Sequence, residues 1–220
     1  MESRLSRRAA RLAIAAVATL AGPLGCSDED PVDAPLVPPF VARSEDQLLT
    51  ALQDAYAHRD LHLFSEVIAI EDGAVYEFHF PDPPNGEAFW DATEELRMHR
   101  RLFEPENVLP GEPPASCPWL LHLVVAFERE SPSWTERPEY YRSASNPGGL
   151  DADRWRATGA IAQSECFVET ASENDYRLES RSEFVVIEDR VKPLGAERKF
   201  LLYRWLDLDG RWKAIKTMCP

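Results

Sequence analysis

Histidines are the residues of this chain best suited to holding a metal ion or moving a proton near neutral pH. The closest pair, His58 and His62, straddles an expected helix boundary and has no third ligand nearby. A protein zinc site needs three or four such ligands in one place. A metal site would require the fold to gather histidines from separate elements, so we expect solvated or core-edge side chains, no metal and no other cofactor. The histidines are His58, His62, His79, His99 and His122.

Three neighbouring acidic residues, Asp91, Glu94 and Glu95, could indicate a carboxylate site for acid–base chemistry. Asp91 and Glu94, however, have the spacing of a capping box at the start of a helix. Glu95 and the arginines that follow it are typical of an ordinary charged helix face. The sequence also contains no glycine-rich phosphate loop and no nucleophile elbow. These residues therefore predict helix structure rather than a reaction.

The stretch GPLGCSDEDP, residues 22–31, places one cysteine between an apolar run and an acidic segment. The run from Leu12 to Leu24 follows an arginine-rich start and is shorter than the ~20 residues of a membrane-spanning helix. Such a run is typical of a secretory signal. Its end resembles the lipobox of bacterial lipoproteins, in which small residues precede a cysteine that is lipidated, for example with palmitate, and becomes the mature N-terminus. This resemblance marks Cys26.

Two departures from the motif leave an alternative open. Pro23 stands where the lipobox usually has leucine, and Leu24 is large for its position. An ordinary secretory signal cut after residues 16–18 would leave Cys26 as a plain thiol, but with an apolar region of only a few residues. We therefore predict that Cys26 is lipidated and attaches the protein to a membrane of the bacterial cell envelope. Ser27, rather than aspartate, favours the outer membrane where enterobacterial sorting rules hold.

Three parts follow one another along the chain. Residues 1–25 form the expected signal peptide, and residues 26–43 form the lipidated N-terminus with an acidic, proline-rich tether. Ser44, with Gln47 three residues later, then forms a capping box at the start of a helix. The remaining residues, 44–220, have the length of a single domain with a substantial core.

Charge excludes one class of function. The chain has 24 basic and 38 acidic residues, and without residues 1–25 it has 20 and 37, a net charge of −17. A domain this acidic is repelled by the phosphates of nucleic acid and by anionic lipid surfaces. We expect no nucleic-acid partner, and contact with the membrane through the lipid anchor.

The first half of the domain carries helical patterns and one strand. Apolar residues at helical spacing predict a first helix over 45–58, and Asp60 caps a second, short helix that the EDG turn at 71–73 ends. The alternating stretch 74–80 predicts a strand. A further helix is expected over 89–103, where apolar residues recur one heptad apart.

The second half is expected to be all β. A long strand over 119–130 is followed by a loop rich in proline and glycine over 131–154, and loops of this length are often functional. An Asp-Gly turn at 209–210 is a strong hairpin signal. The remaining strands are expected over 164–170, 175–189, 199–208 and 211–218.

This order of elements is an α+β pattern, and it resembles the nuclear transport factor 2-like (SnoaL-like) cone fold. The stretch ALQDAYAHRDLHLFSEVIAIEDGAVYEFHF is similar to the opening of that superfamily, and FWDATEELRMHRRLF to its third helix. The chain is most similar to uncharacterised single-domain lipoproteins of this fold. The resemblance covers about residues 44–218 and implies three N-terminal helices packed on a strongly curved antiparallel sheet of five to six strands (cone, cystatin-like).

Ketosteroid isomerases of this superfamily use a carboxylate base near the end of the first strand, a tyrosine on the first helix and a protonated aspartate. When the chain is aligned with this superfamily, Glu77 lies within a residue or two of the position of the base, and Leu52 lies near the position of the tyrosine. Tyr56 lies one turn later and could serve only in a different register. No aspartate in an apolar strand matches the third position. Glu77 and Tyr56 are therefore the catalytic candidates that the resemblance offers.

Three cysteines remain once Cys26 is lipidated, and in an oxidising envelope they indicate one disulfide and a leftover thiol. In the resembled fold, neighbouring antiparallel strands tend to be sequential, and the loop at 131–154 lets Cys166 reach back toward Cys117. We expect a bridge that includes Cys166, with Cys117 ahead of Cys219 as its mate.

The resemblance also implies a cone mouth lined by aromatic side chains. We expect it to bind a small apolar ligand or an envelope protein without catalysis. The alternative is an enzyme of the same fold, a hydrolase, isomerase or dehydratase, that uses a carboxylate or histidine in the pocket. A third reading is a cone filled by its own side chains, with the function on the surface. The candidate binding residues are Tyr56, Trp90, His122, Tyr203 and Trp205.

Overall fold

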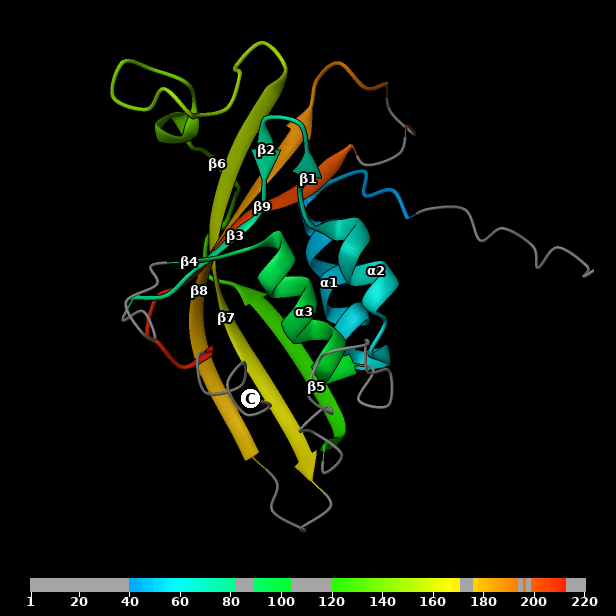
Figure 1. Ribbon diagram of the computed structural model, residues 1–220. Helices are drawn as coiled ribbons and strands as arrows, with labels where there is room; N and C mark the ends of the chain where they lie inside the picture. Colours follow the sequence, from blue (N-terminus) through cyan, green and yellow to red (C-terminus); the bar gives the residue numbers. More distant parts are fainter. Residues whose placement is uncertain are drawn as a thin grey trace, which may run out of the picture. The chain divides into compact units, whose positions relative to one another are not determined.

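The computed structural model describes residues 40–81, 89–103, 120–170, 176–193, 196 and 199–212. Helices pack against one face of a sheet whose two longest strands, β7 and β8, bend around them (Figure 1). The domain is therefore of the α+β class. Its elements are α1 (Glu45–His58), α2 (Leu61–Val67), β1 (Ile70–Glu71), β2 (Ala74–Val75), β3 (Glu77–His79), β4 (Phe89–Asp91), α3 (Ala92–Phe103), β5 (Leu120–Arg129), β6 (Thr135–Glu136), the 3₁₀ turn η2 (Pro138–Tyr140), β7 (Trp155–Thr170), β8 (Tyr176–Asp189) and β9 (Phe200–Asp207).

Helices α1 and α2 begin where predicted because local capping determines their starts. The Ser44 hydroxyl accepts a hydrogen bond from the backbone N–H of Gln47 at 3.2 Å. Arg59, at φ 53°, ends α1 in the left-handed conformation. The Asp60 carboxylate then accepts from the backbone N–H of Leu63 at 2.9 Å and starts α2. The prediction of α1 and of the start of α2 is confirmed. The predicted end of α2 is wrong, because α2 stops at Val67 and the EDG segment at 71–73 lies in the β1–β2 hairpin.

The sheet is mixed, so the prediction of a purely antiparallel sheet is wrong. Its strands lie in the order β4-β3-β9-β8-β7-β5, and β6 pairs with β7 as a seventh strand rather than the expected five or six. Strand β3 runs parallel to β9, with Glu77 beside Arg204, whereas the other pairs are antiparallel. The alternation of side chains in β3 predicts a strand but carries no information about its partner or its direction.

The third helix begins later than predicted. Residues 89–91 form strand β4 against β3, and Phe89 is exposed instead of facing the core. The Asp91 carboxylate accepts from the backbone N–H groups of Thr93 and Glu94 at 2.8 and 3.0 Å. An N-cap residue has an extended backbone, so Asp91 ends the strand and starts α3 at once.

Strand β7 begins nine residues earlier than expected. The expected loop at 131–154 contains β6 and η2, and β6 pairs with β7 at Gly159 and Thr158. The start of β7 is rich in alanine and glycine, which have low strand propensity, and this explains why the pattern missed it. Gly159 has a specific role, because a Cβ there would collide with the guanidinium group of Arg137, which lies across the strand.

The core lies between the helices and the inner face of the sheet. Trp205 of β9 packs against Trp212, Phe184 and Phe78, with ring centroids 4.6, 5.0 and 5.4 Å apart. The outer edge of β5 is covered by α1, where the Gln53 side chain accepts from the backbone N–H of a β5 residue at 2.6 Å. This contact satisfies part of a strand edge that would otherwise be open to other chains.

Several predictions fall on residues that the structure does not describe: the signal peptide, Cys26, most of the tether, Cys117, Cys219 and most of the last strand. Among the described residues, no helix has the length and apolar character to cross a membrane.

Candidate functional site

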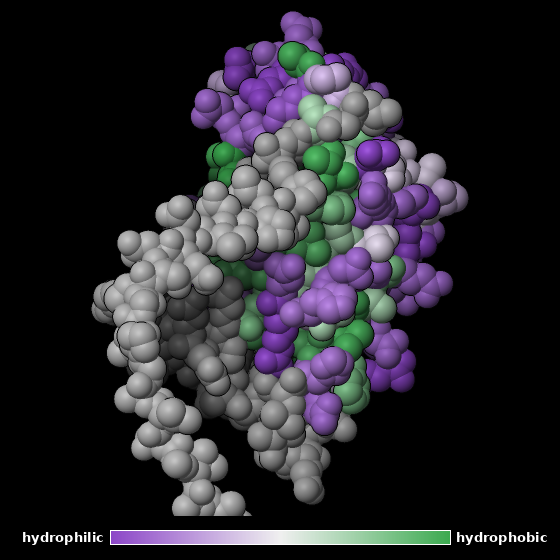
Figure 2. Space-filling model, turned by 90° about the vertical axis from the view of Figure 1, so that its right-hand side faces the viewer, coloured by the Kyte–Doolittle hydropathy of each residue, from purple (hydrophilic) through white to green (hydrophobic). Residues whose placement is uncertain are grey.

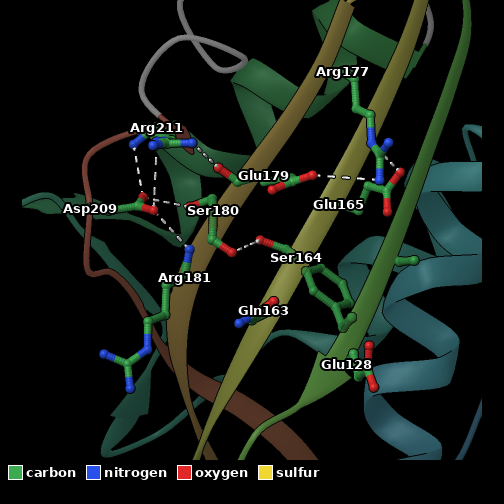
Figure 3. Close-up of a pocket in the computed structure, with 12 residues that line it drawn as sticks. Glu128, Gln163, Ser164, Glu165, Arg177, Glu179, Ser180, Arg181, Asp209 and Arg211 are labelled. Atoms are coloured by element: carbon green, nitrogen blue, oxygen red, sulfur yellow. Dashed lines mark hydrogen bonds and ion pairs between the residues drawn. The ribbon is translucent and has the colours of Figure 1, made fainter.

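One open pocket of about 460 Å³ lies on the outer face of the sheet, away from the helices (Figure 3). Strands β5, β7 and β8 form its floor, and the turn after β9 forms one side. Side chains alternate along these strands, so the exposed residues face the pocket while Cys166 and Ser182 face the core. The residues that shape it include Ala126, Gln163, Glu165, Arg177, Arg181 and Asp209.

The charges in this pocket are paired with one another. Arg177 lies 2.7 Å from the Glu165 carboxylate and 3.5 Å from Glu179. Arg181 donates two hydrogen bonds, of 3.0 and 2.8 Å, to one carboxylate oxygen of Glu130, and these bonds hold the pKa of Glu130 below its usual value. Exposed pairs of this kind add little stability and exchange partners readily. The pocket is therefore a hydrogen-bonding surface of both charge signs.

Two aspartates support the side of the pocket formed by the turn after β9. The buried Asp207 accepts from the backbone N–H groups of Gly210 and Trp212 at 3.1 and 3.0 Å. Asp209 accepts from the Ser180 hydroxyl at 2.8 Å. Burial, and then the charge of Asp209, raise the pKa of Asp207. Burial acts to raise the pKa of Asp209 too, but hydrogen bonds from Ser180 and backbone groups outweigh it and lower that pKa.

A second polar group of residues lies inside the core, between α1, α3 and β3. The Nδ1 atom of His99 is 2.9 Å from the backbone carbonyl of Glu95, which can only accept a hydrogen bond. Nδ1 therefore carries the proton, and Nε2 accepts from the Tyr56 hydroxyl at 2.7 Å. The Tyr76 hydroxyl donates to Glu95 Oε1 at 3.3 Å. We call Tyr56, Tyr76, Glu95 and His99 the buried polar cluster.

This cluster is closed. Its four side chains are at most 1% exposed. The His99 ring stacks on Phe64 with centroids 3.7 Å apart. Burial, and then the charge of Glu95, raise the pKa of Tyr56 and of Tyr76 well above the usual value, so both phenols stay neutral donors. The hydroxyl–imidazole pair has the chemistry of an acid–base catalyst, but all four residues of the cluster are buried.

The two catalytic candidates are not brought together. Tyr56 belongs to the buried polar cluster, whereas Glu77 lies on the opposite face of β3 from the inward-pointing Tyr76. The Glu77 carboxylate contacts His79 at 2.8 Å and Arg204 at 3.1 Å. Burial acts to raise the pKa of Glu77, but these two partners outweigh it and lower that pKa. Glu77 therefore forms an ion pair on the other side of the strand and takes no part in the buried polar cluster.

The five predicted binding residues do not line one surface. Tyr56 and Trp205 are fully buried in the core, and the Trp205 indole N–H donates to the Ser182 hydroxyl at 3.0 Å. Trp90 is half-buried on β4, and His122 is exposed on β5. Tyr203 lies at a β-bulge, under the guanidinium group of the following arginine, 3.6 Å from its ring centroid.

Sequence reasoning assigned Glu95 to a solvated helix face and missed its burial. It expected His99 on the apolar face of this helix, as a core-edge side chain, and missed only its hydrogen-bond partner. A signal was present, because these residues share the apolar face of α3 with Ala92, Leu102 and Phe103 at spacings of three and four. A carboxylate on such a face has to find a buried partner.

The predicted disulfide stays a prediction. Cys166 points into the core with a free thiol, and burial raises its pKa to about 12, while Cys117 lies outside the described residues. Thiol counting by mass spectrometry, on protein taken from the envelope, tests it. Within the described residues, no three histidine, cysteine or acidic side chains are grouped so as to hold a metal ion.

Among known proteins, four chains of solved structures are similar to this one. No family model matches the chain, and no curated protein matches it. A solved structure from Novosphingobium aromaticivorans, assigned provisionally as an aromatic ring hydroxylase, is 12% identical over 73% of this chain and 82% of its own, with a TM-score of 0.41. At this level of similarity nothing about its activity transfers to this chain.

Proposed function

We propose that this protein is a lipid-anchored, non-catalytic protein of the bacterial cell envelope, whose domain binds another envelope protein through the outer face of its sheet. The observation that carries the proposal is the contrast between the two faces of that sheet. Its inner face is filled by aromatic rings in mutual contact, with Trp205 and Trp212 both 0% exposed. Its outer face carries the open pocket (Figure 3).

The chemistry of the pocket favours a protein over a small apolar ligand. Such ligands bind in largely apolar cavities that enclose most of their surface. Here the floor carries exposed arginines and carboxylates on strands β7 and β8. Protein interfaces combine charged groups of this kind at their rim with apolar contacts, and Val124 and Phe167 lie directly opposite each other beside the pocket, 37% and 38% exposed.

Anchoring through Cys26 is supported by the sequence that precedes it, an arginine-rich start and an apolar run ending in a small residue. We place the protein in the outer membrane because serine follows the cysteine. Seen from the helix side, polar residues cover much of the described surface, with apolar residues between them (Figure 2).

We further propose that the domain has the nuclear transport factor 2-like cone fold. The element order supports it: two helices, a short strand pair, a third helix and then long strands. All three helices lie on the same face of the sheet, and the long strands bend around them (Figure 1).

Photocrosslinking in living cells tests the proposal. A benzophenone amino acid at Ala126, on the pocket floor, should give a crosslinked species of discrete mass in the envelope fraction. The matched control is the same amino acid at Thr50, an exposed position on α1. Equal crosslinking from the two positions, or none from Ala126, would overturn binding through the outer face. Labelling with a fatty-acid probe tests the anchor separately: wild type should be marked and Cys26→Ser should not.

One observation favours a second function, an enzyme that uses the buried polar cluster. Tyr56 and His99 form a 2.7 Å hydrogen bond of the kind that activates a hydroxyl. If the cluster is catalytic, His99→Gln should abolish a chemical change that the wild-type protein causes in an envelope extract. The binding proposal expects no such change, and expects crosslinking from Ala126 to be unaffected in His99→Gln.

A further inference from the structure

The β1–β2 hairpin lies at one end of the domain (Figure 1), and exposed aliphatic side chains occur on it and in the turn after β8. Ile70 and Val75 lie directly opposite each other in the hairpin and are 46% and 51% exposed. Val191, in the turn after β8, is 73% exposed. Lys192 ties this turn to the hairpin, since its ammonium group is 3.0 Å from the Glu71 carboxylate. Grouped apolar side chains on a surface indicate contact with another surface.

Charges of both signs are paired at this end of the domain. Arg154 lies 3.2 Å from Asp189 and 3.5 Å from Glu71, and it donates to the backbone carbonyl of Asp72 at 3.4 Å. Its guanidinium group also covers the ring of Trp155, at 4.4 Å from the centroid. The hairpin, the turn and Arg154 together hold three acids and three bases: Glu71, Asp72, Asp189, Arg154, Arg190 and Lys192. Asp151 and Asp153, beside Arg154 and the turn, add two acids, so this end has a small net negative charge, which a zwitterionic surface tolerates better than an anionic one.

The tether enters the domain near the base of the hairpin. The backbone N–H of Phe40, the first described residue, donates to the Glu66 carboxylate at 2.8 Å, and Glu66 lies four residues before Ile70. The thirteen residues 27–39 separate Phe40 from Cys26. At about 3.5 Å per residue they span at most about 45 Å. A lipid on Cys26 thus limits how far this end of the domain can move from the bilayer.

We propose that the β1–β2 hairpin and the turn at Val191 rest on a zwitterionic lipid surface, with Ile70, Val75 and Val191 in the headgroup region. This inference rests on the proposed lipid anchor. It adds an orientation of the domain. Trp155, under Arg154, lies at the hairpin end of β7. Ser164, beside the outer-face pocket, is nine residues further along this strand, about 30 Å away at 3.3 Å per residue. The pocket then faces the aqueous compartment, where an envelope partner reaches it.

The test uses the full-length lipidated protein in phosphatidylcholine vesicles. An environment-sensitive fluorescent amino acid replaces Val75, and brominated phosphatidylcholine is the quencher. The matched control is the same probe at Tyr176, which is 50% exposed at the opposite end of β8. Aliphatic side chains in an interface reach about 5–10 Å into the headgroup boundary, so we expect quenching at position 75 to exceed that at position 176 by at least about twofold.

Three further arms make the outcome decisive. Equal quenching at the two positions in protein that carries the lipid overturns the hairpin contact and leaves the anchor standing. Absence of fatty-acid labelling removes the anchor and the contact with it. Stronger quenching in phosphatidylglycerol than in phosphatidylcholine vesicles would overturn the apolar contact in favour of attraction through Arg190 and Lys192. An Ile70→Asp, Val75→Asp variant probed at Val191 should lose the quenching while fatty-acid labelling continues.

Discussion

Tyr56→Phe deletes one hydroxyl from the buried polar cluster and leaves the ring in place. That hydroxyl donates to His99 Nε2 at 2.7 Å, and both residues are about 1% exposed. Loss of one partner of a buried hydrogen bond costs about 1–3 kcal/mol. In a domain of this size each kcal/mol lowers Tm by about 2–4 °C, so Tm should fall by about 2–12 °C.

Thermal unfolding followed by circular dichroism at pH 7 measures the change. A double-mutant cycle with His99→Phe, which keeps a ring against Phe64, should give a coupling free energy of about 1 kcal/mol. The control Tyr176→Phe removes an exposed hydroxyl and should change stability by less than about 0.5 kcal/mol. A Tyr56→Phe variant no less stable than this control would refute the view that the hydroxyl–imidazole pair stabilises the core.

Three other substitutions probe the fold. Glu77→Gln should lower Tm at pH 7. Because the pKa of the Glu77 carboxyl is depressed in the folded state, the difference in Tm from wild type should shrink as the pH falls below about 4.3 and through the folded-state pKa. A difference in Tm that does not change with pH would contradict the ion pair. Phe103→Ala should cost about 3–5 kcal/mol, and Trp90→Ala, at a half-buried position, less; denaturant unfolding compares them. Gly159→Ala should lower Tm and release the loop that carries Arg137, which faster proteolysis of this loop would show. Unchanged cleavage would count against the packing of Arg137 over Gly159.

Local chemistry made the first two helices predictable. A serine or aspartate whose side chain accepts a backbone N–H three residues later determines a helix start without help from the rest of the chain, as at Ser44 and Asp60. The same rule applies to Asp91, whose capping box excluded residues 89–91 from the helix even though their apolar spacing favoured it.

Long-range pairing could not be predicted in the same way. The parallel register between Phe78 and Trp205 joins strands more than a hundred residues apart, and alternation in each strand is compatible with either direction. The buried polar cluster shows a related difficulty. Charge alone suggested a solvated position for Glu95. Its place on the apolar face of α3 indicated burial, but its partner Tyr76, which precedes β3, is brought to it only by the fold.

The most direct test of binding through the outer face is the mass of the species crosslinked from Ala126 in the envelope, measured on intact protein and on its peptides. The account predicts an adduct heavier by one whole protein other than this chain, joined to this chain at position 126 on the pocket floor. An adduct of small-molecule mass, a pair of copies of this chain, or crosslinking no different from that at Thr50 would contradict it.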